Sequence, residues 1–156
     1  MPARPAASSE GPTSGGARRL EWVGDAARDE AVTLYDAVGG QAFFDVLCRR
    51  FYERVAVDPV LRPLYPAADA DLHAAERWLA MFLGQYWGGP TAYQEERGHP
   101  RLRMRHAHFL VGRRERDAWY AAMAASVAES GAGGTIEARL LEYFSMAADH
   151  MVNTPT

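Results

Sequence analysis

The chain has 156 residues and a formal net charge of −3, and 48% of its residues are hydrophobic. A chain of this length can bury one sizeable core, so we expect a single folded domain. The acidic balance argues against nucleic-acid binding, and no apolar run could span a bilayer or act as a secretion signal, so the sequence predicts a cytoplasmic protein without stable membrane insertion.

The first part of the chain differs in composition from the rest. Residues 1–30 are rich in proline, glycine and serine and show no apolar periodicity. Such a composition does not form a packed core, so we expect a disordered N-terminal arm followed by a folded domain over residues 31–156. From Leu34 onward apolar residues recur at steps of three and four and no alternating pattern persists. The predicted fold class is therefore all-α.

The strongest predicted helix runs from Gln41 to Val57 and is ended by Asp58-Pro59. Its apolar stripe consists of Phe44, Cys48, Phe51, Tyr52 and Val55. Cys48 is the single cysteine, and its place on this stripe indicates a small buried hydrophobe rather than a reactive thiol. A short turn of helix through Leu61 then leads to Tyr65.

A second long helix is predicted from Leu72 to Trp87, with Asp71 as its N-cap. Its inner stripe consists of Ala75, Leu79, Phe82, Leu83 and Tyr86. Gly88-Gly89-Pro90 ends the helix, and we expect an irregular segment that contains Tyr93 to follow.

Three further helices complete the pattern, a short one around 103–109 and two long ones over about 113–130 and 135–152. The glycine-rich stretch 131–134 separates the last two. The sequence thus predicts a helical bundle with a loose middle and no internal repeat.

The stretch RGHPRLRMRHAHF at 97–109 holds three histidines and four arginines. His106 is the best ligand candidate because Arg103 and Phe109 flank it on one helical face, but an ordinary core or surface histidine has the same spacing. His108 lies two residues on and would point to another side. No spacing typical of a zinc site is present.

The four arginines of this stretch allow three interpretations. They could form a solvated face, grip nucleic-acid phosphates, or hold the carboxylates of one small anionic ligand beside His106. The second is disfavoured because the chain is acidic and lacks interleaved aromatics. The third accounts for the histidine and the arginines together.

Three polar aromatic residues lie on or near the apolar stripes. Buried hydroxyl and indole N–H groups usually need hydrogen-bond partners. Tyr52, Tyr65 and Trp119 could therefore be core aromatics bonded to backbone carbonyls, or parts of a site. No nucleophile triad, phosphate loop or inward pair of carboxylates is legible, so hydrolysis is disfavoured.

In order and spacing, the motifs resemble those of the group II truncated haemoglobins, the class of haemoglobin O. They are LYDAVGG at 34–40, RFYERVA at 50–56, MFLGQYWGGP at 81–90, RGHPRLRMRHAHF at 97–109 and ERDAWY at 115–120. The resemblance covers about residues 34–154. It implies a two-over-two helical sandwich around haem b, in which a mostly irregular segment carries the iron ligand.

The resemblance also implies individual roles. His106 matches the proximal histidine, the metal ligand, and the opposite face of the haem stays open for a diatomic gas. The distal residues that it implies are Tyr52, Tyr65, Ala75, Leu79 and Trp119. Of these, Tyr52 and Trp119 are expected to donate hydrogen bonds to bound O2.

Further haem contacts are expected from both sides of the predicted pocket. Arg103 and Arg105 are candidate clamps for the haem propionates, and Tyr93 and His99 are weaker ones. Phe82 and Phe109 are expected to contact the ring. In two places the chain departs from haemoglobin O: the stretch 67–70 is slightly longer, and His108 replaces a proline.

The function implied is reversible binding of O2, and also of CO and NO, at a five-coordinate haem with slow release. Its use would be NO dioxygenation or peroxidase-like chemistry, with electrons from an external reductase. The alternative is a gas sensor or haem-binding module that acts through a protein partner. A homodimer is a further candidate assembly.

Overall fold

The computed structural model describes residues 32–98 and 111–153, and these residues form helices and loops without a strand. In chain order the elements are α3 (Leu34–Ala37), α4 (Gln41–Val57), the 3₁₀ helix η2 (Arg62–Leu64), α5 (Asp69–Tyr86), α6 (Ala92–Arg97), α8 (Arg113–Glu129) and α9 (Gly134–Met151). Over this part of the chain no helix combines the length and the apolar character that crossing a bilayer requires.

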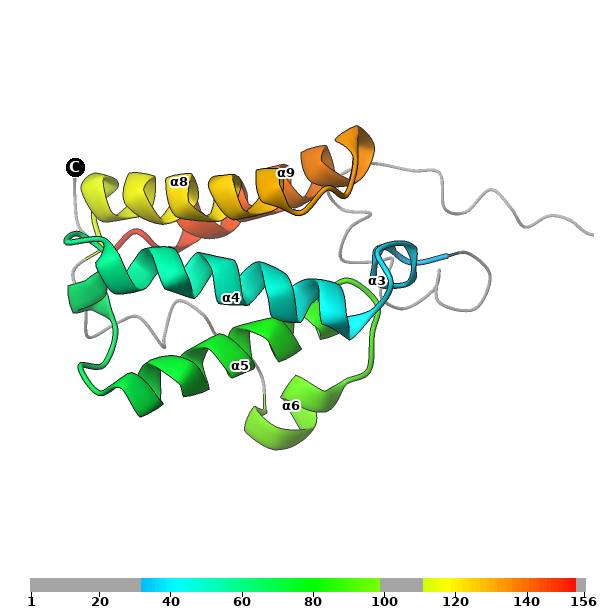
Figure 1. Ribbon diagram of the computed structural model, residues 1–156, viewed down its shortest axis with the longest axis horizontal. Helices are drawn as coiled ribbons and strands as arrows, with labels where there is room; N and C mark the ends of the chain where they lie inside the picture. The colour runs from blue at the N-terminus through cyan, green and yellow to red at the C-terminus, as the bar shows by residue number, and fades with distance from the viewer. Residues whose placement is uncertain (1–31, 99–110, 154–156) are drawn as a thin grey trace, which may run out of the picture.

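The four long helices form two layers, with α4 beside α5 in one and α8 beside α9 in the other (Figure 1). The layers meet where α4 packs on α8, which gives the two-over-two arrangement. The predicted stripe of α4 is buried there, Cys48 included. Burying such side chains contributes about 1.5–3 kcal/mol each, so this stripe is the main tie between the layers.

A charged contact adds to this tie at one edge. The Arg54 guanidinium donates to both carboxylate oxygens of Glu129, at 3.0 and 2.6 Å, and so joins α4 to α8. Both side chains are partly exposed, and exposed ion pairs contribute only about 0.2–1 kcal/mol. The pair therefore fixes the helix register more than it stabilises the fold.

Three predictions about local structure need correction, while α4 has the predicted bounds. Helix α5 begins at Asp69, ahead of the predicted Leu72, and its N-cap is Ala68 rather than Asp71. Asp69 and Asp71 lie instead in its first turn, where carboxylates interact favourably with the helix dipole.

The third correction concerns Tyr93, which lies in helix α6 and not in an irregular segment. The Tyr93 ring is buried and packs edge-on against Phe82 of α5, with ring centroids 5.5 Å apart. This tertiary contact stabilises a helix too short to form alone.

The Gly88-Gly89 pair is where α3 docks on the end of α5. Tyr35 donates its N–H to the Trp87 carbonyl at 3.0 Å. A Cβ on Gly88 would lie 2.6 Å from the Thr33 side chain, and its φ of +111° suits glycine alone. The two glycines thus end α5 and also make room for α3.

Candidate functional site

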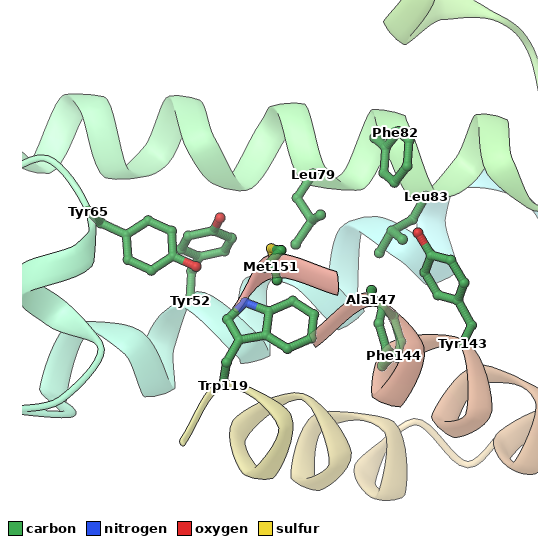
Figure 2. A pocket seen from close by; sticks show the side chains of 10 residues that line it. All are labelled: Tyr52, Tyr65, Leu79, Phe82, Leu83, Trp119, Tyr143, Phe144, Ala147 and Met151. Atoms are coloured by element: carbon green, nitrogen blue, oxygen red, sulfur yellow. The ribbon is translucent and has the colours of Figure 1, made fainter. Parts of the chain in front are cut away.

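A cavity of about 70 Å³ lies between the two layers (Figure 2). Three polar aromatics, Tyr52, Tyr65 and Trp119, gather at one end of it, and apolar side chains form most of the rest. Its complete lining is Tyr52, Tyr65, Leu79, Phe82, Leu83, Trp119, Tyr143, Phe144, Ala147 and Met151.

Two of the polar side chains are placed by the long helices. Tyr52 belongs to the buried stripe of α4, and Trp119 is held on α8 by edge contacts with Phe51 and Phe144, at centroid distances of 5.5 and 6.0 Å. Since these rings belong to the packed core, the positions of the phenol and the indole are fixed by the fold.

Tyr65 lies on the short loop between η2 and α5, and this loop is held by Arg62. The Arg62 guanidinium donates to the carbonyls of Tyr65, Pro66 and Ala67, at 3.4, 2.8 and 2.9 Å. Before η2, the Asp58 carboxylate accepts from two backbone N–H groups that follow it. These bonds keep the Tyr65 ring 5.4 Å from that of Tyr52.

The three polar groups are hydrogen-bonded to one another. The Tyr52 hydroxyl and the Trp119 indole N–H both donate to the Tyr65 oxygen. Burial raises the pKa of Tyr52 well above its ordinary value, and the bond that it donates to Tyr65 raises it further. Burial also raises the pKa of Tyr65 to about 12, although the two bonds that it accepts oppose the rise.

This arrangement leaves the hydroxyl proton of Tyr65 outside the hydrogen bonds within the cluster. Tyr52 and Trp119 each have one donor hydrogen, and both donate it to Tyr65. Among the three side chains, the Tyr65 O–H is therefore the one donor that these mutual bonds do not use. Two accepted bonds polarise this hydroxyl and strengthen it as a donor. The cluster can therefore offer one strong hydrogen bond to a ligand in the cavity.

The raised pKa of Tyr65 predicts a loss of stability at alkaline pH. Between about pH 10, where a tyrosine of the unfolded chain loses its proton, and about pH 12, the folded chain still holds it. Unfolding is then favoured increasingly as the pH rises. In urea unfolding followed over this range, Tyr65→Phe should show a shallower fall in the free energy of unfolding, and parallel curves for both proteins would contradict the buried phenol.

The remaining lining suits a flat apolar group. Leu79, Phe82 and Leu83 of α5 face Phe144 and Ala147 of α9 across the cavity. The volume of about 70 Å³ exceeds the roughly 10–15 Å³ that one water needs, so the cavity has room for a diatomic molecule. The chemistry of the described residues thus fits the ligand end and one wall of a haem site.

The structure brings together five of the side chains expected at the site, Tyr52, Tyr65, Leu79, Phe82 and Trp119. Ala75 is half-buried against the core but does not line the cavity. Tyr93 lies behind Phe82, also outside the lining. The other expected contacts lie outside the described residues and stay predictions: His99, Arg103, Arg105, His106 and Phe109.

Five lining residues were not predicted as site residues. One is Leu83, and the other four belong to α9: Tyr143, Phe144, Ala147 and Met151. They follow one another at steps of one, three and four residues along α9, which places them on one helical face, so the pattern was visible in the sequence. What periodicity could not tell is that this face lines a cavity instead of filling a core.

Comparison with known proteins agrees with this geometry. Residues 33–153 match the model of the bacterial-like globin family. The chain is 40% identical to the group 2 truncated hemoglobin YjbI of Bacillus subtilis over 119 residues, which are 76% of this chain and 87% of that protein.

Two solved structures have the same fold. A thermostable hemoglobin from the actinobacterium Thermobifida fusca shares 53% identity at a TM-score of 0.76, over 80% of this chain and 99% of that one. A truncated oxygen-avid haemoglobin from Bacillus subtilis shares 40% identity at a TM-score of 0.71, over 78% and 99%. The chain therefore belongs to the bacterial-like globin family and is a group II truncated haemoglobin, a haem-based binder of small gas molecules.

Proposed function

We propose that this haemoglobin binds O2 with slow release and uses it in redox chemistry rather than in transport. The observation that carries the proposal is the convergence of three polar aromatics at one end of a mostly apolar cavity. Family membership accounts for gas binding, whereas this polar end bears on how strongly O2 is held.

The haem supplies an iron atom that binds a diatomic molecule, and the chain's own residues hold the haem. The resemblance implies that His106 is the protein ligand of the iron, and we propose that Arg103 and Arg105 clamp the propionates. Leu79 and Phe82 supply the apolar wall. This wall keeps water from the ligand, and hydrogen bonds in such an environment are stronger than in water.

Slow release follows from what the polar end does to O2. Bound O2 carries partial negative charge, and the Tyr65 hydroxyl, supported by Tyr52 and Trp119, can donate to it. A hydrogen bond to a charged group contributes about 1.5–3 kcal/mol, and about 1.4 kcal/mol is tenfold in a rate. Bound CO carries less charge and should gain less from the same donors.

A protein that releases O2 slowly is poorly suited to carry it, which favours a reaction at the site. The description of the Bacillus subtilis relative as oxygen-avid supports this choice. For NO dioxygenation, one NO, one O2 and one electron from an external reductase yield one nitrate. Peroxide reduction is the second such reaction, in which two electrons and two protons convert hydrogen peroxide to two waters.

An absorption spectrum tests the haem and its ligands first. The purified protein, reconstituted with haem, should show a Soret band that shifts on addition of dithionite and again on addition of CO. The O2 complex mixed with NO should then form nitrate in a one-to-one ratio to NO. A normal Soret band without nitrate formation would leave gas binding standing and refute NO dioxygenation.

A further inference from the structure

Besides the main cavity, a second cavity and a surface cleft lie around the start of α8 and the end of α9, at one end of the molecule (Figure 1). The second cavity has a volume of about 20 Å³, and its lining is Leu64, Tyr65, Val111, Glu115, Arg116, Trp119, Ala148 and Met151. The cleft is open to the solvent and is lined by Arg113, Arg116, Asp117, Asp149 and Val152.

The main cavity, the second cavity and the cleft share side chains in sequence. Tyr65, Trp119 and Met151 line both the main and the second cavity, so they form the wall between the two; Figure 2 shows them on the side of the main cavity. Arg116 lines both the second cavity and the cleft. The three spaces therefore lie in series from the polar end of the main cavity to the solvent, and Arg116 separates the last two.

The second cavity suits a small apolar molecule. Val111, Ala148 and Met151 line it and are buried, each at most 6% exposed. The Glu115 carboxylate is engaged elsewhere, since it accepts from the Gly112 N–H at 3.0 Å. The volume exceeds the roughly 10–15 Å³ that one water needs, so the second cavity has room for one diatomic molecule, and apolar cavities of this kind take up such gases.

The Arg116 guanidinium is clamped at the cleft. Its Nε donates to the Asp149 carboxylate of α9 at 2.7 Å. Its two terminal nitrogens donate to Asp117 at 3.2 Å and to the Ser145 hydroxyl at 3.3 Å. The guanidinium also lies over the Tyr120 ring, 5.5 Å from its centroid. Because these contacts fix the side chain, Arg116 closes the second cavity toward the cleft as long as the clamp holds.

We propose that gas molecules reach the polar end of the main cavity through the second cavity, and that Arg116, clamped by Asp149, is the outer closure of this route. The proposal rests on the proposed function, in which the gas is held at that polar end. The inner wall yields most readily at Met151, because its unbranched side chain adapts more easily than the packed rings of Tyr65 and Trp119. The clamp opens transiently, since Asp149 is mostly exposed and exposed ion pairs are weak.

Three substitutions and one control test the closure. Arg116→Ala removes the closing side chain, and Asp149→Ala keeps it but removes the closest of its acceptors. Ala148→Val narrows the second cavity, because Ala148 lines it and is 1% exposed. Arg113→Ala is the matched control, an arginine of the same helix that lines the cleft but not the second cavity.

CO association after flash photolysis of the haem-loaded protein measures entry, because bound CO depends little on the donors at the polar end. The rate should rise about two- to fivefold in Arg116→Ala and less in Asp149→Ala, the factor that an exposed ion pair allows. Arg113→Ala should keep the wild-type rate. Ala148→Val should lower the rate, also when combined with Arg116→Ala. An unchanged rate in Arg116→Ala would remove its role as closure, and an unchanged rate in Ala148→Val would refute the route.

Xenon provides a readout that does not depend on the iron. In crystals of the haem-loaded protein held under xenon pressure, xenon should occupy the second cavity, and Ala148→Val should displace it. A second cavity without xenon in the wild-type protein would overturn the proposal. Failure of the wild-type protein to bind haem would instead refute the proposed function itself.

Discussion

His106→Gly is expected to abolish tight haem binding, and added imidazole is expected to restore it. The resemblance makes His106 the only protein ligand of the iron, so its removal leaves the haem held by apolar contacts and propionate bonds alone. Haem loss should accelerate by roughly two orders of magnitude or more, since even one interaction of about 3 kcal/mol corresponds to over a hundredfold. Haem transfer to an acceptor apoprotein measures this rate.

The matched control is His108→Ala, two residues further on. It should keep the spectrum of a haem protein, because His108 is not assigned to the iron. Imidazole should change the spectrum of His106→Gly and leave that of His108→Ala as it was. The assignment would be wrong if His108→Ala lost its haem while His106→Gly retained it.

Removal of both donors, Tyr52→Phe with Trp119→Phe, should speed O2 release by roughly a hundredfold. Each donor is assigned at least about 1.5 kcal/mol of support to bound O2, directly or through Tyr65, which is about tenfold for each single variant. Phenylalanine retains much of the ring packing around Phe51. CO release should change less, because bound CO carries less charge.

A further prediction concerns Tyr65, the acceptor that Tyr52 and Trp119 share. Tyr65→Phe removes the hydroxyl that Tyr52 and Trp119 both bond to, and so frees two donors to turn toward the ligand. Its effect on O2 release should therefore be smaller than that of the double variant. Stopped-flow displacement of O2 by CO measures the O2 release rates of the two single variants, the double variant and Tyr65→Phe.

Two outcomes would contradict this account of the polar end. Equal acceleration for O2 and CO would mean that the substitutions loosen the packing and remove no electrostatic support. An unchanged O2 rate in Trp119→Phe, with a large increase in Tyr52→Phe, would remove the role of the indole.

The prediction of helices from sequence succeeded where local signals agree. The stripe of α4 repeats at helical spacing, and Asp58-Pro59 ends it, so the bounds of α4 follow from the sequence alone. The start of α5 carries competing carboxylates, and either Asp69 or Asp71 could be a cap by residue type. Only the packing of the loop held by Arg62 places the start at Asp69.

The sequence by itself determined the all-α fold. Through its motifs, it also identified Tyr52, Tyr65 and Trp119 as the polar residues of the site. Only the tertiary structure decided that Tyr65 accepts bonds from the other two and that one face of α9 completes the cavity. The physical reason is that periodicity reports which side of a helix is apolar, and this is a local property of the chain. Which donor meets which acceptor depends instead on contacts between elements far apart in sequence, which exist only once the two layers have packed.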